Sequence, residues 1–276
     1  MNGRFILALY TCVYLPVSLQ AQTLQQYPVA SYAVTGTYSL QHGDLFSSAG
    51  NPAALVRLPG FTVGFLGLRP YLLNELSNYT AIAGIPVSSG NFGVHATFSG
   101  FPGYNESRLG LAYGRKLGNK ADIGVQFSYN NIRIAGYGHA SAIGSGVGMI
   151  LHLTNQVHAG IQVKNPVGGK FGKDQLEKLS SEYVFGTGYE PSSRFYSSIE
   201  IHKTEDRPVN IQVAVQYKPV SSFLIRAGLG SFPAVFWAGA GFLFRRIRLD
   251  LFASHHSQLG ITPGMQVLFY FKSNEK

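Results

Sequence analysis

Apolar and polar residues alternate along much of the chain from residue 61 onwards. The clearest run lies at the C-terminal end, where every second position is apolar: Leu259, Ile261, Pro263, Met265, Val267, Phe269 and Phe271. Runs of the same kind recur at 92–98, 123–129, 157–163, 209–217 and 247–253. A repeat of two residues is typical of a β-strand, whose side chains point alternately to opposite faces. The pattern predicts strands with one apolar and one polar face.

The alternating runs predict fourteen strands, an even number. They are expected at 61–68, 77–86, 91–99, 105–116, 121–134, 140–153, 156–164, 182–190, 194–203, 208–218, 221–230, 233–244, 245–254 and 258–272. Every second connection is short, and longer connections are expected at 69–76, 100–104, 131–139 and 165–181. Bacterial membrane barrels alternate short periplasmic turns with longer outer loops in this way. The spacing therefore predicts a barrel with both termini in the periplasm.

Composition separates this barrel from other proteins that contain alternating strands. Only 13% of the 276 residues are charged, about half the share usual in a soluble domain, yet the mean hydropathy is only +0.07. Strands with one face in lipid and the other in water combine these two properties. A soluble β-sandwich also alternates, but aromatic residues near the strand ends, including Tyr104, Tyr196 and Tyr270, favour a membrane. We predict an all-β, 14-stranded antiparallel transmembrane β-barrel in the outer membrane.

The first 21 residues have the pattern of a secretory signal peptide. Arg4 is followed by an apolar stretch at 5–17 and a polar end. A transmembrane anchor is the alternative, but the stretch is interrupted by Thr11 and Pro16 and is shorter than the ~20 residues that cross a bilayer. The only cysteine, Cys12, lies in this segment. The mature chain is therefore expected to contain no disulfide, no thiolate metal site and no cysteine nucleophile.

Residues 22–60 lack the strand repeat and are predicted to form an N-terminal hatch. A barrel of fourteen strands lies between eight-stranded barrels filled by side chains and 16-stranded porins with an open channel, so its lumen needs a filling. The segment contains Asn51-Pro52-Ala53. Pro52 disfavours helical backbone at Asn51, and Asn51 can bond nearby backbone, which predicts a rigid turn and a short helical start. The expected divisions are 1–21 signal peptide, 22–60 hatch, 61–272 barrel and 273–276 tail.

The hatch motif together with fourteen strands resembles the FadL-like outer-membrane proteins, especially the PorV/PorQ-like branch of Bacteroidota. The segment 109–118, followed by Ile123-Gly124-Val125, is similar to a hairpin of that branch, and Ile225-Arg226-Ala227-Gly228 is similar to one of its strands. The chain departs from the family in its small outer loops, and Asp44 stands alone where an acidic pair is usual before the motif.

The resemblance implies two functions. FadL-like members bind or pass small hydrophobic molecules through a lateral opening with the hatch as gate, and this is the leading expectation. PorV/PorQ-like members are accessory or structural components of type IX protein secretion, and small outer loops disfavour that alternative. A hydrophobic ligand is expected to meet an apolar lumen wall of Phe236, Ala238 and Phe242. The other interpretation is that this wall packs against the hatch.

No enzyme activity, cofactor or metal is expected. A lipid hydrolase is a remote alternative because of His255-His256-Ser257, but the third group of a triad cannot be identified. His95, His152, His158 and His202 are expected to face a wet lumen, with spacing too irregular for a metal site.

The formal net charge of +9 does not indicate nucleic acid, because the basic residues gather at turns and loops. The expected partners are outer-membrane lipid and lipopolysaccharide, a hydrophobic small molecule and secretion-system proteins. One basic group, Arg245, Arg246 and Arg248, is expected to meet lipid headgroups. The other, Lys164, Lys170, Lys173 and Lys178, is expected either to bind lipopolysaccharide phosphates or to form a solvated loop without such a partner.

Overall fold

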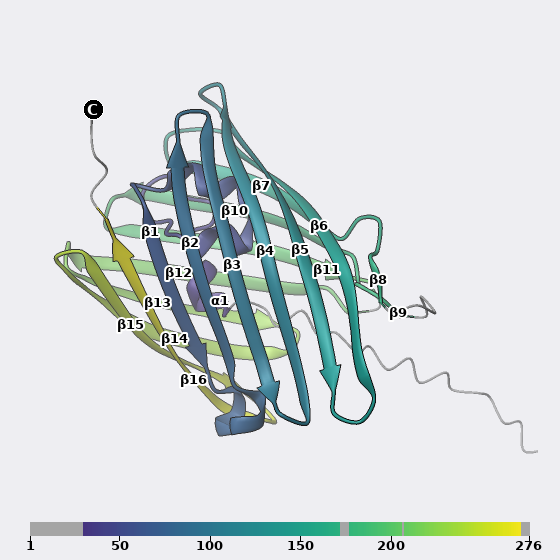
Figure 1. Ribbon diagram of the computed structural model, residues 1–276. Helices are drawn as coiled ribbons and strands as arrows, with labels where there is room; N and C mark the ends of the chain where they lie inside the picture. The colour runs from purple at the N-terminus through teal and green to yellow at the C-terminus, as the bar shows by residue number, and fades with distance from the viewer. Residues whose placement is uncertain (1–29, 172–176, 206, 272–276) are drawn as a thin grey trace, which may run out of the picture.

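The chain forms a closed barrel of fourteen antiparallel strands, which confirms the predicted fold class (Figure 1). The structure is a computed structural model and describes residues 30–171, 177–205 and 207–271. The expected signal peptide with Cys12, Lys173 and the expected C-terminal tail lie outside the described residues.

Neighbouring barrel strands follow one another along the chain, and β1 closes the ring on β16. The barrel strands are β1 (Thr62–Leu68), β2 (Asn78–Val87), β3 (Gly90–Phe101), β4 (Tyr104–Leu117), β5 (Ala121–Ile134), β6 (Gly138–His152), β7 (Val157–Lys164), β10 (Glu182–Ser192), β11 (Phe195–Thr204), β12 (Asn210–Val220), β13 (Phe223–Ser231), β14 (Ala234–Phe244), β15 (Ile247–His256) and β16 (Gly260–Tyr270).

The two ends of the barrel differ in their connections. At one, called the turn end, the strands are joined by 88–89, 118–120, 153–156, 193–194, 221–222 and 245–246. At the other, the loop end, the connection after β1 contains the 3-10 helices η2 (Pro70–Leu72) and η3 (Asn74–Leu76), and the connection after β7 contains a small sheet of β8 (Lys170–Phe171) and β9 (Glu177–Lys178). The longer connections expected at 100–104 and 131–139 are wrong. β3 and β4 pair as far as Phe101 and Tyr104, and β5 and β6 pair as far as Ile134 and Gly138.

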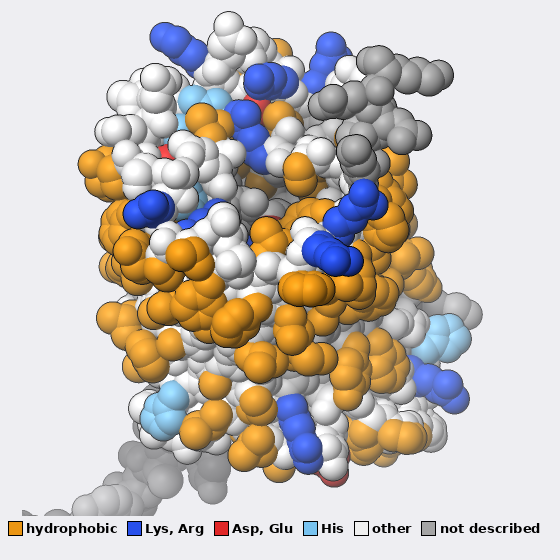
Figure 2. Space-filling model, turned by 90° about the vertical axis from the view of Figure 1, so that its left-hand side faces the viewer, with side chains coloured by type: hydrophobic (Ala, Val, Ile, Leu, Met, Phe, Trp, Pro, Cys, Tyr) orange, Lys and Arg blue, Asp and Glu red, His pale blue; other side chains and the backbone are white. Residues whose placement is uncertain are grey.

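A broad belt of apolar side chains surrounds the outside of the barrel. Figure 2 shows this belt on one face, with most lysine and arginine side chains towards the two ends. Alternation within the strands produces it: on β5, Val125, Phe127 and Tyr129 are exposed, while Gln126 and Ser128 between them are half-buried. Such an outer surface is suited to lipid rather than to water.

The described part of the expected hatch, residues 30–60, lies inside the barrel and is shown in purple in Figure 1. It contains the short helices α1 (Ser31–Val34) and α2 (Ser47–Gly50) and the 3-10 helix η1 (Pro52–Arg57). Its apolar side chains pack against inward residues of the barrel in one buried cluster, which includes Tyr32, Leu45, Phe46, Leu55, Leu66, Ile82, Trp237, Phe252 and Leu268. No helix among the described residues is both long and apolar enough to cross a membrane.

Candidate functional site: the docked hatch and the vestibule above it

The motif Asn51-Pro52-Ala53 attaches the hatch to β6 and β7. Asn51 has extended backbone with φ −153° and ψ 123°, and its Oδ1 accepts a hydrogen bond of 3.0 Å from the backbone N–H of Ala53. Pro52 then begins η1, where its missing N–H costs nothing. The Asn51 Nδ2 donates to the carbonyl oxygen of Ile161 at 3.0 Å. The side chain therefore both caps η1 and binds the barrel wall.

The wall opposite this motif is built from glycine. A Cβ on Gly148 would overlap the Asn51 side chain, and a Cβ on Gly124 would overlap the backbone of Pro52 and Ala53. Both glycines sit at inward positions of their strands, and they let the hatch backbone come into direct contact with the sheet.

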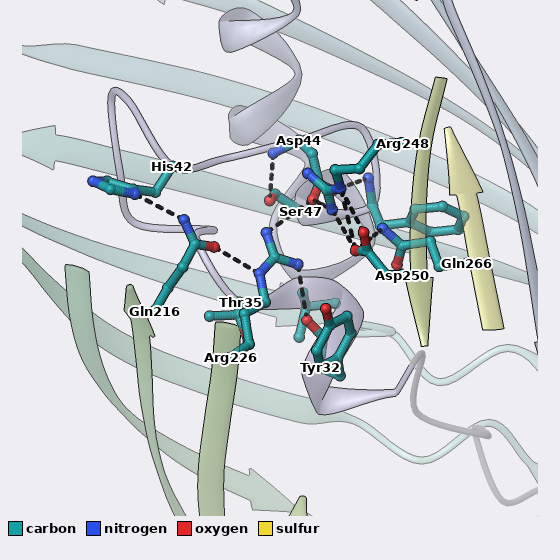
Figure 3. Close-up of polar contacts among 12 residues, drawn as sticks. Tyr32, Thr35, His42, Asp44, Ser47, Gln216, Arg226, Arg248, Asp250 and Gln266 are labelled. Atoms are coloured by element: carbon teal, nitrogen blue, oxygen red, sulfur yellow. Dashed lines mark hydrogen bonds and ion pairs between the residues drawn. The ribbon is translucent and has the colours of Figure 1, made fainter. Parts of the chain in front are cut away.

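Asp44 forms the electrostatic centre of hatch docking (Figure 3). Its Oδ2 lies 2.6 Å from Nη2 of Arg248 and 3.0 Å from Nη2 of Arg226, which come from β15 and β13. Arg248 also pairs with Asp250 at 2.8 Å, and the Arg226 Nη1 donates to the carbonyl oxygen of Tyr32 at 3.1 Å. All of these side chains are nearly inaccessible to solvent. The hatch thus contributes one carboxylate to a buried group that contains two arginines and a second carboxylate.

Burial alone would raise the pKa of the Asp44 carboxyl. Arg248 and Arg226 outweigh that effect and hold the pKa of Asp44 below its usual range. The carboxylate is therefore ionised at neutral pH, and the charges of the group are matched. A buried pair of this kind is strongly destabilising when one partner is removed, by about 3–5 kcal/mol, since the remaining charge has no access to water.

His42 extends this group through a neutral hydrogen-bonded chain. Burial lowers the pKa of His42, so its ring is uncharged at neutral pH. Its Nδ1 accepts from the Gln216 amide at 2.8 Å, and its Nε2 donates to the Ser192 carbonyl at 3.0 Å. Gln216 Oε1 in turn accepts from the Arg226 Nε at 2.6 Å. These hydrogen bonds fix the orientation of the Arg226 guanidinium, which holds Asp44.

Glu190 of β10 forms a second attachment of the hatch. Its carboxylate accepts from the backbone N–H groups of Leu40 and Gln41, at 3.1 and 3.2 Å, and from the Ser39 hydroxyl. His158 Nε2 donates to the same carboxylate at 2.8 Å. A barrel carboxylate thus caps a hatch turn, as a side-chain acceptor caps a helix N-terminus.

Further polar contacts lead from the His158 ring to the C-terminal end of the hatch. His158 Nδ1 lies 3.0 Å from His152 Nδ1, and Arg57 Nη2 lies 2.7 Å from both His152 Nε2 and Asp122 Oδ2. The four histidines predicted to face the lumen do so: His152 and His158 join two hatch attachments, and His95 and His202 line the vestibule. No group of three or more His, Cys, Asp and Glu residues in the described part of the chain is arranged to hold a metal ion.

A cavity of about 280 Å³, called the vestibule, lies between the hatch and the loop end. Its hatch side includes Val34, Phe46 and Ala49, next to Ile82 of β2. The surrounding wall is largely polar and includes Thr80, Thr97, Arg108, Gln126, Ser128, Asn130, Glu182, Glu200, His202 and Gln212. The vestibule therefore combines an apolar floor with a polar wall.

The prediction that Phe236, Ala238 and Phe242 form a wall of the lumen is wrong, because these residues lie on the outer side of the barrel. Phe236 and Phe242 are 51% and 56% exposed on the outer surface, and Ala238 shares their side of β14. Trp237 points inward and meets Tyr32 edge to face at a centroid distance of 5.9 Å. Both faces of β14 are apolar, so alternation alone does not show which one faces the lumen. Packing against the hatch does occur, but through Trp237.

The two basic groups predicted to contact lipid also need correction. Arg248 is buried with Asp44 rather than facing headgroups, whereas Arg245 is exposed at the turn end. Lys164 lines the vestibule and pairs with Glu182 at 3.0 Å. Strand alternation indicates that Arg248 shares a face with Asp250. It does not show that Arg248 pairs with Asp44, because the hatch is distant in sequence.

His255 and His256 occupy successive positions at the loop end of β15 and therefore point to opposite faces of the barrel. The His256 Nδ1 accepts from the backbone N–H groups of Gln258 and Leu259, at 3.1 and 3.3 Å. The two rings do not converge on Ser257, and His256 serves the turn. The geometry gives no support to a lipid hydrolase.

Comparison with solved structures identifies proteins of similar fold. No protein-family model and no curated protein sequence matches the chain. The structure is similar to the CymD monoaromatic hydrocarbon channel, with a TM-score of 0.64, 11% identity and coverage of 85% of this chain and 94% of CymD. It is also similar to the P. putida toluene transporter TodX, with a TM-score of 0.64, 11% identity and coverage of 84% and 95%. A Pseudomonas aeruginosa FadL homologue matches with a TM-score of 0.52, 11% identity and coverage of 82% and 92%. The chain therefore has a FadL/TodX-like fold, which confirms the predicted FadL-like resemblance at the level of fold, while the PorV/PorQ branch stays a prediction.

Proposed function

We propose that the chain is an outer-membrane channel that takes up small, partly apolar molecules at the loop end and passes them across the membrane when the hatch moves. The lipid-facing belt and the fold shared with a toluene transporter support a membrane channel. In the proposed orientation the turn end lies in the periplasm, as is usual for barrels with short turns on that side.

The observation that carries the proposal is the vestibule above a hatch whose apolar packing is supplemented by polar contacts. The hatch is attached through ion pairs of Asp44 and hydrogen bonds to Glu190, which can break and form again. The vestibule floor offers an apolar surface at the half-buried residues Val34 and Ala49, and its wall offers polar partners. This combination suits a small molecule with apolar and polar parts.

The accessory role in type IX secretion has less support. The connections 102–103, 135–137 and 232–233 at the loop end are very short, so the described residues present little surface to a protein client. Capture of a large secretion barrel with this chain, and unchanged uptake when its gene is deleted, would favour that alternative.

Deletion of residues 30–58 tests the gate directly in planar bilayers. We expect low conductance from the full chain and a large, steady conductance from the deleted chain, because the lumen loses its filling. Proteoliposome uptake of a graded set of small molecules, from toluene to amino acids, then identifies the solute class. Equal conductance of the two chains would contradict the proposal that the hatch closes the lumen.

A further inference from the structure

Most charged side chains of the vestibule wall are paired with one another. Lys164 Nζ lies 3.0 Å from Glu182 Oε2, and His202 lies 3.3 Å from Glu182 and 2.8 Å from Glu200. These residues belong to β7, β10 and β11. This side of the vestibule satisfies its own charges.

Another part of the wall, on β4, holds a cation and an anion that do not contact each other. Arg108 donates from Nε to the neutral Asn130 at 2.6 Å, and Glu106 accepts from the neutral Tyr104 hydroxyl at 2.6 Å. Neither side chain is in direct contact with an opposite charge among the described residues, although Arg108 attracts Glu106 and Glu182 from a greater distance. Both line the vestibule. The terminal nitrogens of Arg108 and one oxygen of Glu106 are left for other partners.

The spacing of the two charges is set by the strand. Glu106 and Arg108 are two positions apart on the inner face of β4, which places their Cα atoms about 6.6 Å apart. Their neutral partners, Tyr104 and Asn130, hold the two side chains and keep them from closing on each other. Unpaired charges away from bulk water are costly, and a ligand that supplies both opposite charges relieves both.

The apolar floor lies next to this charge pair. His95 and Ile82 occupy the same level of the sheet, one step closer to the hatch than Thr97 and Thr80, which are level with Arg108. Val34 and Ala49 of the hatch, both half-buried, also border the vestibule. A ligand bound to Arg108 therefore has an apolar surface within reach on its hatch side.

We propose that the vestibule is a binding site for small zwitterions of the α-amino acid type that carry an apolar side chain. The ligand carboxylate pairs with the guanidinium of Arg108, the ammonium pairs with Glu106, and the apolar side chain packs towards Val34 and Ala49 of the hatch. This inference deepens the proposed channel function by naming its solute class, and its binding step does not require transport.

Three probes with the same alkyl group separate the contributions. L-leucine carries both charges, 4-methylpentanoate carries only the carboxylate, and 3-methylbutylamine carries only the ammonium. Binding is measured by calorimetry on the full chain purified in detergent. We expect L-leucine to bind at least about tenfold more tightly than either analogue, because each analogue leaves one wall charge unpaired.

Two variants test the assigned partners. Arg108→Gln should weaken L-leucine binding about tenfold or more and leave 3-methylbutylamine unchanged, whereas Glu106→Gln should weaken L-leucine and leave 4-methylpentanoate unchanged. Arg133→Gln, which removes an exposed arginine of β5 outside the vestibule, serves as the matched control and should bind like the unmodified chain.

Equal binding of the three probes to the unmodified chain would overturn the zwitterion site without recourse to any variant. Binding of L-leucine that is insensitive to both substitutions would overturn the assignment to Arg108 and Glu106. Tight and selective binding without uptake into proteoliposomes would instead overturn the channel function and leave the site in place.

Discussion

Asp44 is the residue on which the charge balance inside the barrel depends. It lies in the hatch, while Arg226 and Arg248 project from strands much later in the chain, at sequence separations of 182 and 204. With Asp44 in place, two arginines face two carboxylates, because Asp250 completes the group. Without Asp44, the two arginines of this group would face a single carboxylate.

Replacing Asp44 with asparagine should loosen the hatch. The substitution keeps the shape but leaves Arg226 without an ion-pair partner, a loss of about 3–5 kcal/mol for a buried pair. We expect frequent open-channel events in planar bilayers and faster proteolysis of the hatch. Glu205→Gln, which removes an exposed pair with Lys178, is the control and should leave both readouts unchanged.

The same carboxylate predicts a dependence on pH. Because the pKa of Asp44 in the folded protein lies below its usual value of about 3.9, its stabilising effect is complete above that value. The effect is lost as the pH falls through the lowered pKa. Conductance of the unmodified chain should therefore stay constant from about pH 8 to pH 5 and rise only in stronger acid. A smaller acid-induced rise in Asp44→Asn would support this origin, and an identical rise in both proteins would contradict it.

At the scale of elements, β14 shows how inward and outward faces are chosen. Phe236 and Phe242 are as apolar as Trp237, yet they face outward while Trp237 faces the hatch. Gly239 and Gly241 share the Trp237 face, and a Cβ on Gly239 would crowd Tyr32. The inner face is therefore the one whose small residues leave room for the hatch ring.

This choice predicts different outcomes for two aromatic substitutions on one strand. Trp237→Ala removes a buried contact with Tyr32 and should destabilise hatch docking by about 3–5 kcal/mol. Phe236→Ala trims a side chain on the outer surface and should leave hatch protection against protease nearly unchanged. Comparable loosening in the two variants would show that the hatch does not depend on Trp237.

At the scale of the whole molecule, the barrel separates two environments across a single layer of strands. Val125 is 43% exposed on the outer belt, and its neighbour Gln126 lines the vestibule. The low content of charged residues and the near-neutral mean hydropathy of the chain reflect this difference in environment between successive residues.

A pair of arginine substitutions measures this separation. Val125→Arg should destabilise the barrel by about 2–4 kcal/mol if it lies near the middle of the bilayer, and Gln126→Arg should cost much less because the vestibule is polar. Unfolding in lipid vesicles with increasing guanidinium reports both changes. Equal costs would mean that β5 does not face lipid through Val125.

The strands, their number and their pairing order could be predicted from the sequence because they depend on local alternation. Predicted and observed strands agree closely, for example 121–134 with Ala121–Ile134. The motif at Asn51 was also recognisable, since a proline fixes the conformation of the residue before it and the effect is local.

The sequence by itself therefore determined the barrel, its lipid-facing belt and the presence of a hatch. Only the tertiary structure decided which face of β14 is the lumen face, which arginines hold Asp44, and which charges of the vestibule remain unpaired. These features depend on contacts between residues far apart in the chain, such as Asp44 with Arg248 and Ser39 with Glu190. Alternation predicts which side chains point inward. The closure of the barrel and the path of the hatch determine which residues those side chains contact.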